Sequence, residues 1–217
     1  MLGRIRTSNA AAAGRIRKRW IALVAAFVIA FLALIAVGAL MRSPAEDPTS
    51  YGQAAIGGPF RLTDQNGGRV SNQDFAGKYM LIYFGYTYCP DICPMTLANM
   101  TAALDELPPD LAEQVVPIFI TVDPKRDTVE QLAAYAPAFH PRLVALTGTD
   151  AEVKAATRAY RVYFRQAGGE EGGGDYLVDH SSFIYLMGPQ GAYRAHFSHD
   201  ASPERIASGV QRELASR

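Results

Sequence analysis

The first feature of the hydrophobic pattern is a long stretch near the N-terminus. Residues 21–41 hold no charged side chain, and Gly38 is the one position among them that is not hydrophobic. At about 1.5 Å per residue, a helix of this length spans the roughly 30 Å hydrocarbon core of a membrane. Residues 1–20 carry six basic side chains and no acidic one, which predicts a cytoplasmic N-terminus. We therefore expect a transmembrane helix over 21–41, with the rest of the chain beyond the membrane.

A cleaved signal peptide is the alternative interpretation of this stretch, because small residues lie near its end. The apolar core of a signal peptide is usually only about 7–15 residues long, which favours a retained anchor. Residues 42–55 are rich in Pro, Ala and Ser and predict a linker. Residues 56–217 then remain for one domain with a single core.

Within 56–217 the pattern alternates between apolar runs and stretches with helical spacing. Residues 79–87 and 115–122 are continuous apolar runs, as in buried strands. After Cys93 the apolar positions fit one helix, which ends before two prolines. The other predicted elements are a hairpin over 60–64 and 69–71, helices over 128–139, 150–160 and from 203 to the C-terminus, and strands over 143–146, 162–166, within 176–187, and over 192–197. This order predicts an α/β fold with parallel strands flanked by helices, compatible with a thioredoxin-like fold.

Three of the predicted helices have recognisable start signals. Asp127 lies three residues before Glu130, the spacing of a capping box, so we expect Asp127 to cap the helix that follows. We expect Asp150 to cap the next helix. Ser202 followed by proline predicts the start of the last one.

Charge and composition narrow the possible functions. The chain has 21 basic and 21 acidic residues, and 49% of its residues are hydrophobic, which excludes a wholly disordered protein. Without the first 20 residues, 15 basic residues face 21 acidic ones, a net charge of −6. No basic stripe follows residue 20, so we expect no nucleic-acid partner.

The candidate chemistry lies at Cys89 and Cys93, the two cysteines of the chain. They fall where a predicted buried strand gives way to a helix, at the sheet edge where α/β folds place their sites. The positive end of a helix favours thiolates, and a spacing of four lets both sulfurs face the same way. The pair could close a disulfide or bind a soft metal ion. A purely structural disulfide is the alternative, although so short a loop gains little stability from closure.

A metal ion would need a third ligand, and four histidines are available. We expect His140 in a surface loop and structural or exposed places for His196 and His199. His180 differs, because it follows the glycine-rich loop 167–175 and begins an apolar strand. It could reach the cysteines if its strand neighbours the first buried strand. From position alone, a metal ligand and an ordinary hydrogen-bonded side chain both remain open for His180.

Three sequence motifs follow one another along the chain. They are Phe-Gly-Tyr-Thr followed by Cys-Pro-Asp-Ile-Cys-Pro over 84–94, Val-Asp-Pro-Lys-Arg-Asp-Thr over 122–128, and Asp-Tyr-Leu-Val-Asp-His-Ser over 175–181. Together and in this order they resemble the Sco/SenC family, whose members assist the assembly of cytochrome c oxidase. The resemblance covers about residues 56–217, and the N-terminal anchor matches as well. It implies a thioredoxin-like fold that binds copper through the two motif cysteines and the motif histidine. In this chain those residues are Cys89, Cys93 and His180.

Copper chemistry agrees with this ligand set. Two thiolates and one imidazole suit soft Cu(I), although they could also hold Zn(II) with one open position. The resemblance favours copper, as Cu(I) and secondarily as Cu(II). Asp179 either orients the site or offers an oxygen to Cu(II), or it is a turn residue. For Asp127 we expect a structural role.

The resemblance implies a membrane-anchored copper chaperone. It would take copper from a donor protein and deliver it to the binuclear copper centre in the copper-bearing subunit of cytochrome c oxidase. The alternative function is a thiol-disulfide oxidoreductase that keeps the cysteines of that subunit reduced, with Cys89 attacking first. The expected location is a bacterial inner membrane with a periplasmic domain, or a mitochondrial inner membrane with the domain facing the intermembrane space.

Overall fold

The computed structural model describes residues 28, 30, 31, 56–167, 177–180 and 182–216, five of them (166, 167, 177, 179 and 180) by their backbone alone. The chain divides into two units, Met1–Gln53 and Ala54–Arg217. In the first unit, residues 28, 30 and 31 are helical. Most of the predicted anchor at 21–41, the basic segment 1–20 and the linker 42–55 lie outside the described residues. Within the described residues, no helix has both the length and the hydrophobicity needed to cross a membrane.

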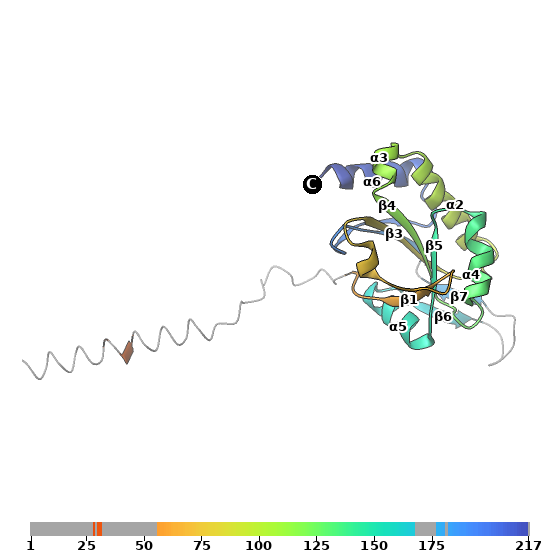
Figure 1. The fold of residues 1–217 in the computed structure, drawn as a ribbon, viewed down its shortest axis with the longest axis horizontal. Helices are drawn as coiled ribbons and strands as arrows, with labels where there is room; N and C mark the ends of the chain where they lie inside the picture. Colours follow the sequence, from red (N-terminus) through yellow and green to blue (C-terminus); the bar gives the residue numbers. More distant parts are fainter. Residues whose placement is uncertain (1–27, 29, 32–55, 168–176, 181, 217) are drawn as a thin grey trace, which may run out of the picture. The chain divides into compact units, whose positions relative to one another are not determined.

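The second unit is built on a mixed seven-stranded sheet with the strand order β2-β1-β5-β4-β3-β8-β9 (Figure 1). Strands β3, β4 and β5 are parallel, whereas β1 and β8 join this parallel centre in antiparallel pairs. The strand bounds are β1 Arg61–Asp64, β2 Arg69–Ser71, β3 Tyr79–Gly85, β4 Val115–Thr121, β5 Val144–Thr147, β8 Phe183–Met187 and β9 Tyr193–Ser198. The continuous apolar runs at 79–87 and 115–122 are therefore central strands, as their patterns predict.

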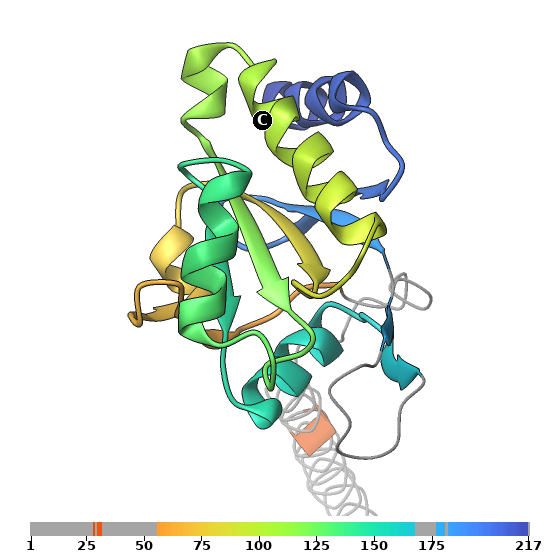
Figure 2. The ribbon, with the colours of Figure 1, turned by 90° about the vertical axis from the view of Figure 1, so that its right-hand side faces the viewer.

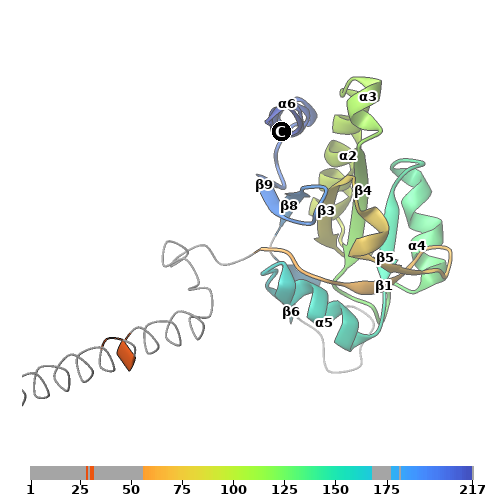
Figure 3. The same cartoon turned by 60° about the vertical axis from the view of Figure 1, so that its left-hand side comes forward.

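Helices cover both faces of this sheet. The bounds are α2 Ile92–Asp105, α3 Pro109–Ala112, α4 Val129–Tyr135, α5 Asp150–Ala159 and α6 Pro203–Ala215, with 3-10 helices η2 Asn72–Phe75 and η3 Ala136–Ala138. Helices α2 and α6 lie side by side, and α4 covers the same face of the sheet (Figure 2). Helix α5 lies beside β1 on the opposite face (Figure 3).

Successive residues of β3 show how the two faces differ. Tyr83 points toward α2, where its hydroxyl donates to Cys93 Sγ at 3.5 Å. Phe84 points to the other face and packs on Tyr160, which follows α5, with 5.3 Å between the ring centroids. All seven residues of β3 are buried. The strand that leads into the cysteine motif is therefore held by packing on both sides.

The region around residues 162–187 differs from the prediction of an edge strand and one further strand. Strands β6, Phe164–Ala167, and β7, Leu177–His180, pair with each other in a separate two-stranded sheet. Strand β8 then starts a new pairing with β3. The predicted single strand within 176–187 is thus two strands in two sheets, since β7 ends at His180 and β8 begins at Phe183.

Two of the three expected helix caps are wrong by one residue. Thr128 caps α4 by accepting a hydrogen bond from the Gln131 amide, so Asp127 is not the cap. Thr149 caps α5 in a capping box with Glu152, so Asp150 is instead the first helical residue. Ser202 caps α6 with proline at the first helical position, as predicted. Threonine hydroxyls accept from an amide as aspartate does, so sequence alone did not choose between adjacent candidates.

Candidate metal and redox site

Cys89 and Cys93 lie at the junction between β3 and α2. Cys93 is fully buried, Cys89 is partly exposed, and both are thiols rather than a disulfide. The Cys93 amide donates to Cys89 Sγ at 3.3 Å. The side chain of Asp91, the N-cap residue of α2, makes no capping hydrogen bond. The Cys89 sulfur therefore accepts one of the helix-start amides, where the positive end of the helix favours a thiolate.

The Cys93 thiol is enclosed on the sheet side. It accepts a hydrogen bond from Tyr83 at 3.5 Å, and a Cβ added at Gly85 would lie 3.1 Å from its sulfur. A hydrogen bond with Cys89, together with burial, raises the pKa of the Cys93 thiol well above its ordinary value. Cys93 is therefore the buried thiol of the pair and the harder one to ionise, and Cys89 is the more accessible one.

A buried carboxylate fixes the chain just before the cysteines. Asp127 accepts hydrogen bonds from the Thr87 amide at 3.0 Å, from the Thr87 hydroxyl at 2.6 Å and from the Thr121 hydroxyl at 2.6 Å. It has no exposed surface, and burial raises the pKa of its carboxyl group. These bonds tie the end of β4 to the loop that leads to Cys89. The expected structural role of Asp127 is confirmed, although by this network and not by capping.

Arg126 adds positive charge beside the cysteine loop. Its guanidinium pairs with Asp123 at 2.5 Å and lies 4.8 Å from the ring centroid of Tyr88. The arginine side chain is only 14% exposed, whereas Tyr88 is 53% exposed. A desolvated guanidinium over an aromatic ring is a favourable arrangement that holds Tyr88 beside Cys89.

His180 and Asp179 are described by their backbone in β7, and their side chains lie outside the described part of the structure. The backbone nevertheless reaches the cysteine end of the sheet. The Val178 amide donates to the Tyr86 hydroxyl at 3.2 Å, and His180 follows two residues later. After β7, β8 pairs Ile184 with Tyr83, six residues before Cys89. The backbone of His180 therefore lies near the carboxyl end of β3, where the cysteine loop begins.

The other histidines are placed elsewhere. His140 Nδ1 accepts from the Arg142 amide at 3.0 Å, and its side chain is only 11% exposed, which makes it less of a surface residue than expected. His196 is exposed and packs edge-on against Phe183. Among the described side chains, no three from His, Cys, Asp and Glu gather closely enough to hold a metal ion. Accordingly, His140, His196 and His199 do not complete a site with the two cysteines.

Sequence reasoning missed the roles of Tyr83 and Tyr86. Both are buried, and their hydroxyls contact Cys93 and the β7 backbone. A usable signal was present, because a tyrosine in a buried strand needs a partner for its hydroxyl. The sequence did not show which groups those partners would be.

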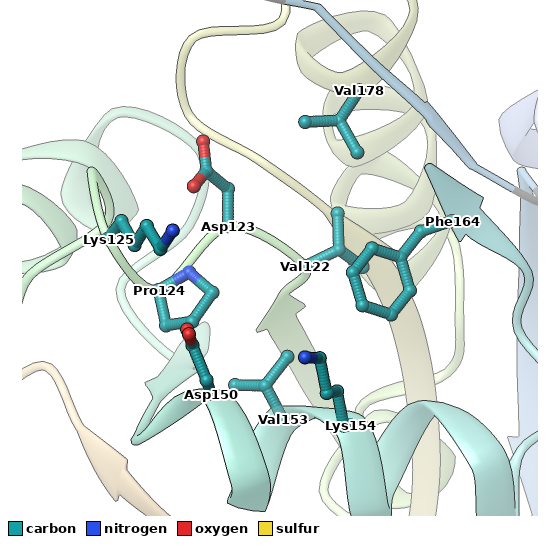
Figure 4. A pocket seen from close by; sticks show the side chains of 9 residues that line it. All are labelled: Val122, Asp123, Pro124, Lys125, Asp150, Val153, Lys154, Phe164 and Val178. Carbon is teal, nitrogen blue, oxygen red and sulfur yellow. The ribbon is translucent and has the colours of Figure 1, made fainter. Parts of the chain in front are cut away.

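A cavity of about 190 Å³ lies between the two-stranded sheet β6–β7, the loop after β4 and helix α5 (Figure 4). Phe164 and Val178 line it from the two-stranded sheet, Val122 lines it from the loop after β4, and Val153 lines it from α5. Lys125 and Lys154 add charged groups to the lining. Through Val178, strand β7 thus forms part of the wall of this cavity.

The fold and the buried–exposed thiol pair define an α/β protein with a dithiol at the start of a helix. Residues 48–215 match the SCO1/SenC family, so the chain belongs to this family. The Arabidopsis thaliana protein "SCO1 homolog 1, mitochondrial" is 44% identical over 165 residues, which cover 76% of this chain and 49% of the relative. The chain spans about half to two thirds of the length of the first curated relatives that it matches.

Solved structures agree with this assignment. The crystal structure of Arabidopsis thaliana ScoI with copper bound superposes with a TM-score of 0.69 at 42% identity, covering 75% of this chain and all of that chain. The structure of BsSco is 27% identical with a TM-score of 0.58 over 76% of this chain and 98% of that one. It is described as having a disulfide switch and as a member of the Sco family of cytochrome c oxidase assembly proteins. The mixed sheet with flanking helices therefore matches the thioredoxin-like structures of Sco proteins.

Proposed function

We propose that this chain is a membrane-anchored copper chaperone that supplies the binuclear copper centre of cytochrome c oxidase during assembly. Cys89, Cys93 and His180 would bind the ion, as Cu(I) or secondarily Cu(II), and Asp179 would orient the imidazole or offer an oxygen. The main support is that the Tyr86 hydroxyl contacts the strand that carries His180 beside two thiols at a helix start. The copper-bound structures of relatives at about 40% identity support the choice of metal.

The donor set explains how copper would be handed over. Two sulfurs and one imidazole nitrogen satisfy Cu(I) with three bonds and leave a side open for an incoming ligand. A thiolate of the copper-bearing oxidase subunit would join the ion before the chaperone ligands leave, and a donor protein would load the site in the reverse order. Only reduced cysteines bind metal, so closing the Cys89–Cys93 disulfide would switch binding off.

The second candidate function is a thiol-disulfide oxidoreductase, favoured by the partly exposed Cys89 and the buried Cys93. Cys89 would attack a disulfide of the oxidase copper subunit and release one of its thiolates. Cys93 would then attack the resulting mixed disulfide, releasing the second thiolate and closing the Cys89–Cys93 bond. Two electrons thus pass from the pair to the target disulfide. The disulfide switch described for BsSco supports the same chemistry in a relative of this chain.

For either function we propose the location that the sequence predicts. The helix over 21–41 would anchor the chain in the membrane, and the domain would lie on the side opposite the basic N-terminus. This topology places the domain in the periplasm of a bacterium or in the intermembrane space of a mitochondrion. Both compartments permit disulfide chemistry.

Replacing His180 separates the two functions. We expect His180→Ala to weaken Cu(I) binding by the reduced full chain more than 100-fold, beyond the range known for groups that only support a ligand. The dithiol would still reduce disulfides, because both sulfurs remain. Competition with a chromogenic Cu(I) chelator measures affinity, and oxidase activity of membranes measures assembly.

His196→Ala is the matched control, since His196 is an exposed histidine of β9. It should leave copper affinity unchanged. Assembly that is lost in His180→Ala supports copper delivery. Assembly that persists while copper affinity is lost would favour the reductase function, and undiminished copper affinity would contradict the ligand assignment.

A further inference from the structure

Tyr86 contacts both the cysteine loop and strand β7. It lies one residue past β3 and is 3% exposed. Its backbone carbonyl accepts a hydrogen bond from the Cys89 amide at 3.3 Å. Its hydroxyl accepts from the Val178 amide at 3.2 Å, across 92 positions of the sequence. One residue thus bonds to the nucleophilic cysteine and to the strand that carries His180.

The Tyr86 hydroxyl is buried near the two thiols. Burial raises the pKa of Tyr86, and so does the negative charge of ionised Cys89 and Cys93. The hydrogen bond that the hydroxyl accepts from the Val178 amide is itself buried. A buried amide that loses its acceptor is costly, so removing this hydroxyl should destabilise the position of Val178.

The bond between Val178 and Tyr86 joins strand β7 to the cysteine end of the sheet. It pairs with β6, outside the seven-stranded sheet. Its Val178 side chain borders the 190 Å³ cavity (Figure 4). His180 follows Val178 by two residues, roughly 7 Å along a strand. A change at the Val178 amide would therefore be transmitted to the position of His180.

We propose that Tyr86 is a positioning residue of the copper site, whose hydroxyl holds the His180 strand against the cysteine loop. Its phenol oxygen accepts from the Val178 amide of β7, and its backbone carbonyl accepts from the Cys89 amide. This inference rests on the proposed copper-binding function and adds a group that holds the two halves of the site together. Tyr86 itself is not a ligand in this arrangement.

The test removes the hydroxyl alone, in Tyr86→Phe, from the reduced full chain. We expect Cu(I) affinity, measured against a chromogenic chelator, to fall about 10- to 100-fold, the range for groups that orient metal ligands. The Val178 amide of the metal-free protein should exchange its hydrogen faster. In protein loaded with Cu²⁺, the nitrogen splitting of the electron paramagnetic resonance spectrum should weaken, because it reports on the imidazole.

Tyr79→Phe is the matched control, because it removes a buried hydroxyl at the opposite end of β3, 3.4 Å from the Glu213 carbonyl. It should match the unaltered chain in copper affinity and in Val178 exchange. Unchanged affinity and exchange in Tyr86→Phe, with affinity lost in His180→Ala, would overturn the role of Tyr86 and leave the proposed function standing. Failure of the unaltered chain to bind copper would overturn both.

Discussion

Asp127 at the cysteine end of the sheet and Glu152 on its β1–α5 side each fix a loop, yet in opposite electrostatic settings. Asp127 is fully buried and accepts three hydrogen bonds from neutral groups. Glu152 is partly exposed, pairs with Arg69 at 2.5 Å and closes the capping box of α5. Burial raises the pKa of Asp127, whereas the hydrogen bond from Arg69 and those from Thr149 lower the pKa of Glu152 to about 2.

This difference shows how the two regions are stabilised. The cysteine end depends on dry hydrogen bonds and close packing, in which a missing partner is expensive. The β1–α5 side depends on a solvent-screened ion pair, which contributes little. A strand followed by a helix is thus held by hydrogen bonds to a buried carboxylate where the thiols lie, and by a partly exposed ion pair at the start of α5. Three substitutions measure the contrast, from the largest effect to the smallest.

Asp127→Ala should have the largest effect on stability. It removes the acceptor of the buried Thr121 hydroxyl and of the partly buried Thr87 amide and hydroxyl. We expect the free energy of unfolding to fall by about 2–4 kcal/mol. Denaturant unfolding measures this change. Asp91→Ala, an exposed carboxylate without a capping bond, is the control and should stay within about 0.5 kcal/mol of the unaltered chain. Equal effects of the two variants would remove the contrast between the regions.

Gly85→Ala should have an intermediate effect. The added Cβ would lie 2.9 Å from Tyr83 Cε1, 3.0 Å from Phe119 Cε2 and 3.1 Å from Cys93 Sγ. Overpacking at such a place costs about 1–3 kcal/mol, and it should also displace the Cys93 sulfur and weaken copper binding. Thermal unfolding and copper titration measure both effects.

Gly188→Ala is the control for Gly85→Ala. A Cβ added at Gly188 would lie 3.4 Å from the nearest atoms, which belong to the flexible Arg194 side chain, and this is an ordinary contact distance. We expect little change in stability or copper binding. If Gly85→Ala matched this control in stability and copper binding, the side chains around Cys93 would accommodate the added methyl group more easily than their packing indicates.

Glu152→Gln should have the smallest effect, and it depends on pH. Because the folded-state pKa is lowered to about 2 from 4.5, the stabilisation is present above pH 4.5 and is lost as the pH falls toward 2. The exposed ion pair limits it to about 1 kcal/mol. Unfolding between pH 2 and 6 should show a shallower slope in the variant.

Arg69→Gln removes the other partner of the ion pair, so it should remove most of the same pH dependence of the free energy of unfolding. A pH dependence that is unchanged in both Glu152→Gln and Arg69→Gln would show that the pair contributes nothing measurable.

For Asp127 the pH dependence of stability has the opposite sign. Its raised pKa means that its stabilisation is greatest below pH 3.8 and falls as the pH rises through the folded-state pKa.

Much of the fold could be predicted from the sequence. The apolar runs of β3 and β4, the helix after Cys93 and the cap at Ser202 follow from local pattern and local chemistry. The α/β class and the position of Cys89 and Cys93 at the strand–helix junction follow with them. The cap of α4 was placed one residue too early and that of α5 one residue too late, because adjacent threonine and aspartate side chains offer the same acceptor.

The site could be predicted only in part. The spacing of the cysteines indicated a thiol pair, but nothing local indicated which thiol would be buried. The contact between Tyr86 and Val178 spans 92 positions, and no periodicity encodes such a contact. The split of 176–187 into β7 and β8 also depends on partners, since β6 and β3 lie in different sheets.

By itself, the sequence determined the elements and the chemistry available at Cys89, Cys93 and His180, because hydrophobic spacing and side-chain type are local properties. The tertiary structure alone decided that Cys93 is enclosed by Tyr83, that Asp127 ties Thr87 to Thr121, and that Tyr86 links β7 to the cysteine loop. Each of these depends on chain segments that are distant in sequence and meet at one end of the sheet. Burial there strengthens their hydrogen bonds and raises the cost of losing one.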